Sequence, residues 1–292
     1  MTNLHTQNFL PYFFMLPALL IGMITMISYG VGFHIWIQNM FIWVVGISFC
    51  YVMSTKNTFK FLDISPLSIL TFLIFLLIMP FWFNGIEGVH RWITFGPFNF
   101  YIASICLPIL IINLWTLSIN KNLSFMIGFM FLIEGILLLQ PDAGQITAFA
   151  SASTIILWRA IENSIWKYIS LLLLAFFVIA SWIFLDHLAP VPYVEQIIFL
   201  VADMGSIFLC LGVLALLLLI YPFFIPWKKD TLSLALGLYF LMTILVTFAG
   251  HFPMPIMGYG ISPIIGYLIA ITAIQKIKIE QTEKKGFTND EN

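Results

Sequence analysis

The residue types that could do chemistry in this chain lie in short breaks between long apolar runs. One break, at positions 138–145, reads L-L-Q-P-D-A-G-Q, in which Pro141 interrupts a helix and Gly144 permits a tight turn. The carboxylate of Asp142 in this break is costly against lipid, so it must meet water, a partner group or a ligand. One interpretation is that Asp142 only caps the next helix. The alternative is that it caps the helix and also belongs to a functional site.

Other breaks carry further acids, imidazoles and aromatic side chains. Carboxylates and imidazoles can exchange protons with a substrate, and a guanidinium can hold an anion. Two of the histidines, His34 and His187, are more simply interpreted as polar residues at a membrane interface. The other candidates are Glu87, His90, Arg91 and Trp92 in positions 84–100, Asp186 and Glu195 in positions 186–196, and His251 and Tyr259 in positions 250–261.

The composition places these breaks in a membrane protein. The chain of 292 residues is 61% hydrophobic and 9% charged, with a mean hydropathy of +1.04, whereas a soluble domain carries about 25% charged residues. The few charges form no basic face, which argues against nucleic acid as a partner. Cys50, Cys106 and Cys210 fall inside apolar runs without metal-ligand spacing, so we expect neither a disulfide framework nor a metal site from them.

Ten apolar segments could cross a membrane when helix tilt and neighbouring helices are allowed for. We predict an all-α polytopic membrane protein in which residues 1–274 form a single ten-helix transmembrane domain. Residues 275–292 are polar and of mixed charge, which predicts a disordered cytoplasmic tail. The predicted spans are residues 9–30, 36–53, 65–83, 101–119, 124–139, 146–157, 165–185, 197–224, 232–249 and 262–274.

The positions of the basic residues predict the orientation. With the amino terminus in the cytoplasm, all of the twelve Lys and Arg residues except Arg91 lie in or beside cytoplasmic connections or the tail. This positive-inside pattern predicts that both termini are cytoplasmic and that the breaks rich in acids and imidazoles face outward. Because Arg91 opposes the bias, we expect it to hold an anion, either an acid of this chain or a ligand phosphate. Glu134 lies within a span, where it either forms a hydrogen bond inside the bundle while protonated or lines a polar groove.

Three of the breaks resemble loops of one family, the SEDS proteins of the FtsW/RodA group. Positions 88–100, G-V-H-R-W-I-T-F-G-P-F-N-F, are similar to the G-x-x-R-W-I-x-x-G loop after the third span of that family. Positions 139–145, L-Q-P-D-A-G-Q, are similar to its L-Q-P-D-x-G turn after the fifth span. Positions 254–262, M-P-I-M-G-Y-G-I-S, are similar to its L-P-x-x-S-Y-G-G-S loop before the last span, and positions 36–46 match the start of its second span more loosely.

The resemblance implies a function and a location. SEDS proteins are glycosyltransferases that polymerise lipid II, the lipid-linked precursor of peptidoglycan, at the outer face of the bacterial cytoplasmic (inner) membrane. They act in cell division or cell-shape maintenance together with a class B penicillin-binding protein. For this chain the resemblance therefore implies lipid II, membrane lipids and such a protein as partners.

The resemblance also implies roles for particular residues. Glu195 lies where the catalytic acid proposed for the family would fall, with Asp186 as the alternative. Arg91 is expected near the lipid pyrophosphate, with Asp142 positioning either Arg91 or a divalent cation. The remaining substrate-binding candidates are Gln140, His90, Trp92 and Tyr259.

Several residues of the family motifs are replaced in this chain. Ser104 and Leu107 stand where the family has an acid and a lysine at the start of the fourth span. Gly258 stands in place of the serine of S-Y-G-G, and the outer connection at 186–196 is much shorter than that of the family. Two alternatives to a polymerase follow: a catalytically degenerate SEDS-like scaffold for a class B penicillin-binding protein, or a transporter of a lipid-linked precursor.

Overall fold

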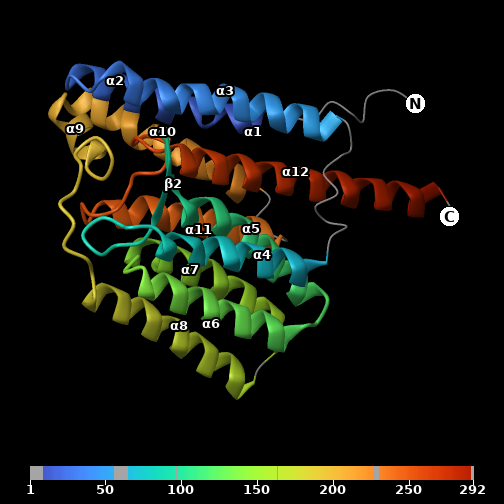
Figure 1. Ribbon diagram of the computed structural model, residues 1–292. Helices are drawn as coiled ribbons and strands as arrows, with labels where there is room; N and C mark the ends of the chain where they lie inside the picture. The colour runs from blue at the N-terminus through green and yellow to red at the C-terminus, as the bar shows by residue number, and fades with distance from the viewer. Residues whose placement is uncertain (1–8, 56–64, 97, 163, 226–229, 291–292) are drawn as a thin grey trace.

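The computed structural model describes residues 9–55, 65–96, 98–162, 164–225 and 230–290, which form a bundle of α-helices with one short β-hairpin (Figure 1). The predicted all-α fold is confirmed, and the hairpin is an addition that the apolar pattern did not predict. The elements are α1 (Leu10–Phe13), α2 (Leu16–Ser28), α3 (Phe33–Thr55), α4 (Pro66–Ile78), the 3-10 turn η2 (Met79–Trp82), β1 (Trp92–Phe95), β2 (Phe98–Tyr101), α5 (Ile102–Ile119), α6 (Leu123–Leu139), α7 (Ala143–Ala160), α8 (Ile165–Ile183), α9 (Ile197–Asp203), α10 (Ser206–Phe224), α11 (Thr231–Thr247) and α12 (Ile261–Asp290).

Five helices of the described chain are long and apolar enough to cross a membrane. They lie at Leu10–Ser28, Phe33–Val52, Ile102–Ile119, Ile165–Ile183 and Ser206–Phe224. Shorter apolar helices lie at Pro66–Trp82, Leu123–Leu139, Thr231–Thr247 and Ile261–Ile277. Together with α7, these helices overlap the ten predicted spans, and the number that cross the membrane stays a prediction.

Three helices differ from the predicted spans. α7 begins three residues earlier than predicted because the side chain of Asp142 caps it, accepting a hydrogen bond from the backbone N–H of Gln145. The eighth predicted span is divided into α9 and α10, because Gly205 between them has a φ of 119° that a helix cannot continue. α12 continues past residue 274 to Asp290, where a disordered tail is expected, through a run of Lys, Glu and Gln that favours helix.

The helix α5 lies at the centre of the bundle and packs against α4, α6, α7 and α12. The Ala- and Ser-rich helix α7 packs along α11, since small side chains let two helix backbones approach closely. In Figure 1, α2, α3 and α10 lie on one side of this centre and α6 and α8 lie on the other.

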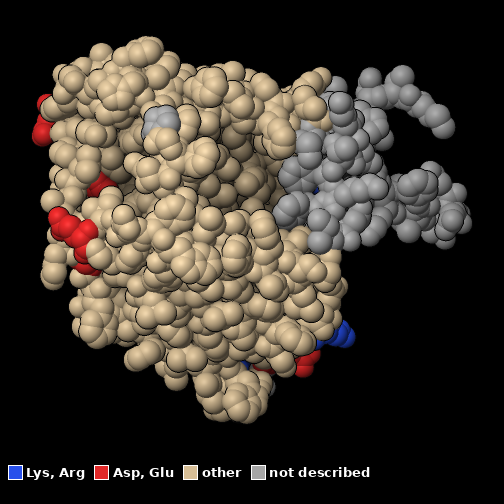
Figure 2. Space-filling view, viewed as in Figure 1, with Lys and Arg blue, Asp and Glu red and all other residues tan. Residues whose placement is uncertain are grey.

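The connections that carry the candidate site residues meet at one end of the bundle. In Figure 1 the segments before β1, after α8 and before α12 all lie at the left, whereas the described end of α12 lies at the right. Figure 2 shows that acidic side chains on this face of the molecule gather mainly at the same left end. The division into an outer and a cytoplasmic side stays a prediction.

The close contact between α12 and α5 gives a test of the packing. A Cβ added at Gly266 of α12 would lie 2.1 Å from the backbone oxygen of Ser104 on α5. We expect Gly266→Ala to lower the apparent melting temperature of the detergent-purified protein, because overpacking a tight contact costs about 1–3 kcal/mol.

The matched control is Gly128→Ala on α6, where a Cβ would meet no atom within 4 Å. Alanine is the better helix former, so this change should leave the melting temperature unchanged or raise it slightly. Equal effects of the two substitutions would contradict the packing of α12 on α5.

Candidate functional site

Two connections, the segment after α8 and the segment before α12, are joined by backbone hydrogen bonds. The N–H of Met254 donates to the carbonyl of Val194 at 3.0 Å. The N–H of Tyr259 donates to the carbonyl of Tyr193, also at 3.0 Å. A Cβ at Gly258 would lie 2.5 Å from the Val194 oxygen, so a side chain there would push the segments apart. This contact accounts for glycine at the position where the resembled loop has serine.

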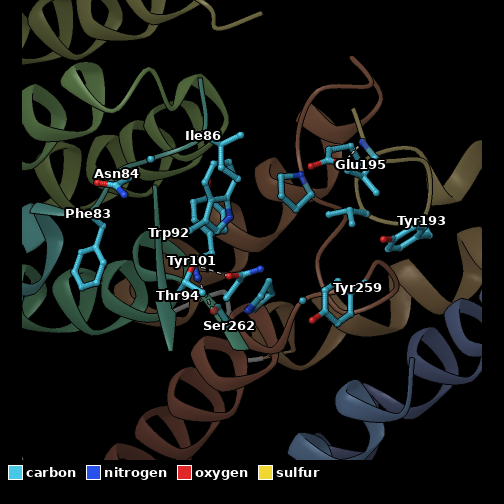
Figure 3. A pocket seen from close by; sticks show the side chains of 17 residues that line it. Phe83, Asn84, Ile86, Trp92, Thr94, Tyr101, Tyr193, Glu195, Tyr259 and Ser262 are labelled. Atoms are coloured by element: carbon cyan, nitrogen blue, oxygen red, sulfur yellow. Dashed lines mark hydrogen bonds between the residues drawn. The ribbon is translucent and has the colours of Figure 1, made fainter. Parts of the chain in front are cut away.

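The joined segments form one wall of a cavity of about 460 Å³, and the residues of the β1–β2 hairpin contribute to the opposite wall (Figure 3). Small-molecule sites commonly measure roughly 300–1,000 Å³. Of the predicted site residues, Trp92, Glu195 and Tyr259 line this cavity. Sequence reasoning did not select Tyr101, Tyr193 or Asn99, which also line it.

Among the described residues that line the cavity, Glu195 is the only acid. Its side chain is half-buried, and its Oε2 accepts a hydrogen bond from the backbone N–H of Val191 at 2.7 Å. Burial raises the pKa of Glu195 to about 7, although the backbone hydrogen bonds and the charge of Arg91 act to lower it. A carboxyl group with this pKa can accept a proton near neutral pH.

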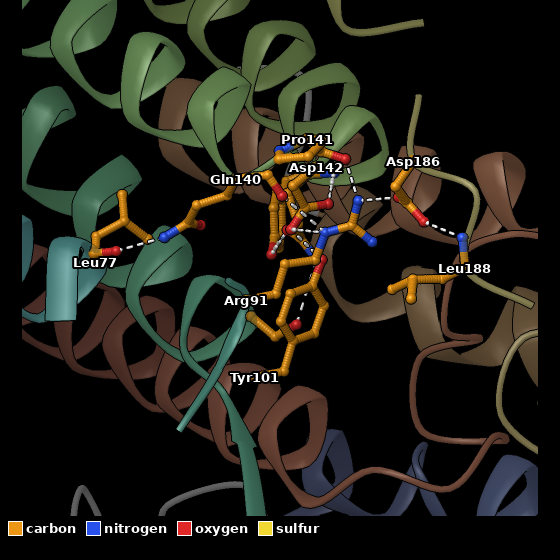
Figure 4. Close-up of polar contacts among 11 residues, drawn as sticks. Leu77, Arg91, Tyr101, Gln140, Pro141, Asp142, Asp186 and Leu188 are labelled. Atoms are coloured by element: carbon orange, nitrogen blue, oxygen red, sulfur yellow. Dashed lines mark hydrogen bonds and ion pairs between the residues drawn. The ribbon is translucent and has the colours of Figure 1, made fainter. Parts of the chain in front are cut away.

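Arg91 lies immediately before β1 and is buried, with 3% of its surface exposed. Its Nε donates to the carbonyl of Gln140 at 3.1 Å, and its terminal nitrogen donates to the carbonyl of Pro141 and to the carboxylate of Asp186 (Figure 4). The carboxylate of Asp142 lies 3.9 Å from Nε. The expected pairing of Arg91 with an acid of this chain is therefore present, and two acids take part.

Asp142 serves both as a helix cap and as a member of this network. It is fully buried, and one carboxylate oxygen caps α7 through the N–H of Gln145 at 3.2 Å. The other oxygen accepts a hydrogen bond from the hydroxyl of Tyr101 at 2.5 Å. Because the Tyr101 side chain also lines the cavity, it connects the cavity wall to the buried ion pair.

The charges of the network are mutually dependent. Burial acts to lower the pKa of the Arg91 guanidinium, but the nearby Asp142 and Asp186 raise it above its ordinary value. Burial also raises the pKa of Asp142, against the opposing effects of Arg91 and the Tyr101 hydroxyl. Asp186 is held in turn by the backbone N–H of Leu188, which donates to its second oxygen at 3.0 Å. The guanidinium thus forms its hydrogen bonds and ion pairs with groups of this chain.

Gln140 and His90, like Arg91 and Asp142, are predicted substrate-binding residues that do not line the cavity. The side chain of Gln140 points to α4, where its Nε2 donates to the carbonyl of Leu77 at 2.6 Å. His90 forms a hydrogen bond at 3.0 Å between its Nδ1 and the carbonyl of Phe83 and packs beside Phe81. Both side chains hold the surrounding connections in place.

Uncharged side chains, Ser104 and Leu107, stand at the positions of the acid and lysine of the resembled motif. Ser104 accepts a hydrogen bond from Nε2 of Gln145 at 3.3 Å. Oε1 of Gln145 accepts one from the hydroxyl of Tyr239 at 2.8 Å. Leu107 is fully buried in the core. Uncharged hydrogen bonds therefore take the place of a charged pair here.

Glu134, the acid within a predicted span, is buried in α6. Neither of its carboxylate oxygens has a hydrogen-bond partner among the described residues. It does not line the cavity described above, so its position adds nothing to the candidate site.

The residues present do not fit a bound divalent cation. No group of three or more His, Cys, Asp and Glu side chains in the described part of the chain could hold a metal ion. Asp142, for which such a role is predicted as one alternative, is already held by Tyr101 and the start of α7.

Comparisons with known proteins support the resemblance at the level of the fold. The sequence matches no family model and no curated protein. The structure, in contrast, has the fold of a SEDS protein. It is similar to the crystal structure of the rod shape determining protein RodA of Thermus thermophilus, with a TM-score of 0.65 and 16% sequence identity over 94% of this chain and 98% of that one. A single-residue variant of the same protein matches with a TM-score of 0.65 and 15% identity over 93% and 98% of the two chains.

The buried network predicts a specific loss of stability. Asp142→Asn keeps the size of the side chain and its capacity to cap α7, but it removes one of the two negative charges beside Arg91. We expect the free energy of unfolding to fall by about 1.5–3 kcal/mol, the range for a hydrogen bond to a charged group. The measurement is the apparent melting temperature in detergent.

Asp203→Asn is the matched control, because Asp203 is exposed at the end of α9. A surface change of this kind should be nearly neutral. If the two variants have the same melting temperature, the ion pair does not stabilise the fold in the way the geometry implies.

Proposed function

We propose that this chain is a SEDS-type peptidoglycan glycosyltransferase, a multi-pass protein of the bacterial cytoplasmic membrane. It polymerises lipid II at the outer face, in cell division or cell-shape maintenance, with a class B penicillin-binding protein as partner. The fold supports this proposal, and so do the three motif-like connections that meet at one end of the bundle. A shared fold alone does not establish an activity, so the chemistry of the site carries the argument.

The observation that carries the proposal is the position of Glu195. It lines the 460 Å³ cavity and has a pKa of about 7. A general base works best when its pKa lies near the operating pH, because it is then deprotonated yet still basic. Asp186, the alternative acid, is bonded to Arg91 and does not line the cavity, so Glu195 is the better base.

The reaction then needs one base and no covalent intermediate. Glu195 takes the proton of a sugar hydroxyl on the acceptor, and the oxygen attacks the anomeric carbon of the donor. The bond between that carbon and the lipid pyrophosphate breaks as the new glycosidic bond forms, and the pyrophosphate leaves with the electron pair. A single displacement of this kind inverts the anomeric centre.

The geometry favours a structural role for Arg91 over direct contact with the pyrophosphate. Its guanidinium donates to two carbonyls and one carboxylate and is almost completely buried. In the proposed site it holds the segment after α8, through Asp186, against the turn between α6 and α7. That segment carries Glu195, so Arg91 acts as a positioning residue.

The assignment of the base predicts the effect of one substitution. Glu195→Gln keeps the shape of the side chain but cannot accept the proton, so we expect polymerisation to fall by about a hundredfold or more. The assay follows labelled lipid II into glycan ladders, with the purified protein and its partner reconstituted together. Glu87→Gln is the control, because Glu87 is exposed in the connection before β1 and does not line the cavity. Full activity of Glu195→Gln would show that another group is the base.

A catalytically degenerate scaffold is the second candidate function. The uncharged side chains of Ser104 and Leu107 and the hydrogen bonds of the buried Arg91 to its own chain favour it. In that case the wild-type protein would bind a class B penicillin-binding protein in detergent but would form no glycan from lipid II. Glycan formation that depends on Glu195 would exclude this alternative.

A further inference from the structure

The cavity has walls of aromatic rings and uncharged polar groups. Figure 3 shows Trp92 and Tyr101 on the side of the hairpin and Tyr193 and Tyr259 on the opposite side. Aromatic rings provide large, rigid apolar faces, and their polar atoms can still form hydrogen bonds at the edge. Such walls suit a flat ligand that has both an apolar face and polar edges.

Polar side chains of the same lining can bind hydroxyl and amide groups of a ligand. Asn84 and Asn99 line the cavity, and each offers an amide that can both donate and accept. The Oδ1 of Asn99 accepts a hydrogen bond from the hydroxyl of Thr94 at 2.8 Å, which orients the amide. Glu195 adds a carboxylate on the opposite side.

The described lining contains no Lys, Arg or His. The nearest guanidinium, Arg91, is held behind the wall by Asp142 and Asp186, so one positive charge faces two acids there. Phosphate sites in proteins are built from Arg, Lys or several backbone N–H groups aimed at the anion. A diphosphate in this cavity would instead meet the carboxyl group of Glu195 and no cationic side chain of the described lining.

We propose that the cavity binds an uncharged, hydroxyl-bearing sugar ring, and that the diphosphate of a lipid-linked donor is not held by its side chains. The ring packs between the hairpin wall and Tyr193 and Tyr259, with its hydroxyl and amide groups facing Asn84, Asn99 and Glu195. This inference rests on the proposed function for the identity of the ligand, and it assigns the cavity to the acceptor sugar. Glu195 is then next to the hydroxyl from which it takes a proton.

Calorimetric titration of the detergent-purified full chain tests this inference. The probes are a neutral tetrasaccharide of N-acetylglucosamine and sodium pyrophosphate. We expect the tetrasaccharide to bind and pyrophosphate neither to bind nor to compete. Trp92→Leu and Tyr193→Ala should each weaken binding about tenfold, the loss typical of a buried aromatic contact. Tyr193 is suited to this change because its backbone carbonyl, not its ring, joins the two segments.

The matched control is Trp82→Leu, because Trp82 is 65% exposed and does not line the cavity. It should bind the tetrasaccharide as the wild type does, and melting temperatures show which variants remain folded. Absent binding of the tetrasaccharide, binding unchanged in both cavity variants, or competition by pyrophosphate would each overturn the inference. Tetrasaccharide binding by a protein that forms no glycan would uphold it while refuting the proposed function. Glycan formation without such binding would refute this inference alone.

Discussion

The buried charge of Arg91 is the constraint on which the site depends. A guanidinium removed from water costs several kcal/mol unless partners replace its hydration. Here the partners come from two distant parts of the chain, the turn between α6 and α7 and the segment after α8. Meeting the requirements of one cation therefore brings the connection before β1 together with both of these segments. The L-Q-P-D turn contributes through two backbone carbonyls as well as through the carboxylate of Asp142.

Tyr101 connects this buried frame to the cavity. Its hydroxyl bonds to Asp142, its backbone N–H donates to Oγ of Ser262 at the start of α12, and its ring lines the cavity. The second wall is fixed separately, by the backbone bonds between the segments after α8 and before α12. The cavity is thus held between an ion pair on one side and a backbone-paired loop on the other. Rigid walls of this kind can bind a ligand without a large ordering cost.

The parts of this arrangement that the sequence predicted are those with local signals. The apolar runs predicted the helices, and the position of Arg91 against the charge bias predicted an anion beside it. Asp186 as its second partner depends on the path of the segment after α8, which no local pattern encodes. Tyr101 was not selected as a site residue, because spacing alone does not show that its hydroxyl reaches Asp142. The break at Gly205 was missed for a related reason, since a glycine inside an apolar run is compatible with an unbroken helix.

The central claim is that Glu195 acts as a base in the cavity, and the pH dependence of polymerisation tests it most directly. Burial raises the pKa of Glu195 to about 7, and a base acts only when deprotonated. The rate of glycan formation by the wild-type protein with its partner should therefore be low in acid and rise as the pH increases through about 7. A rate that is flat through this region, or that falls as the pH rises, would contradict the account.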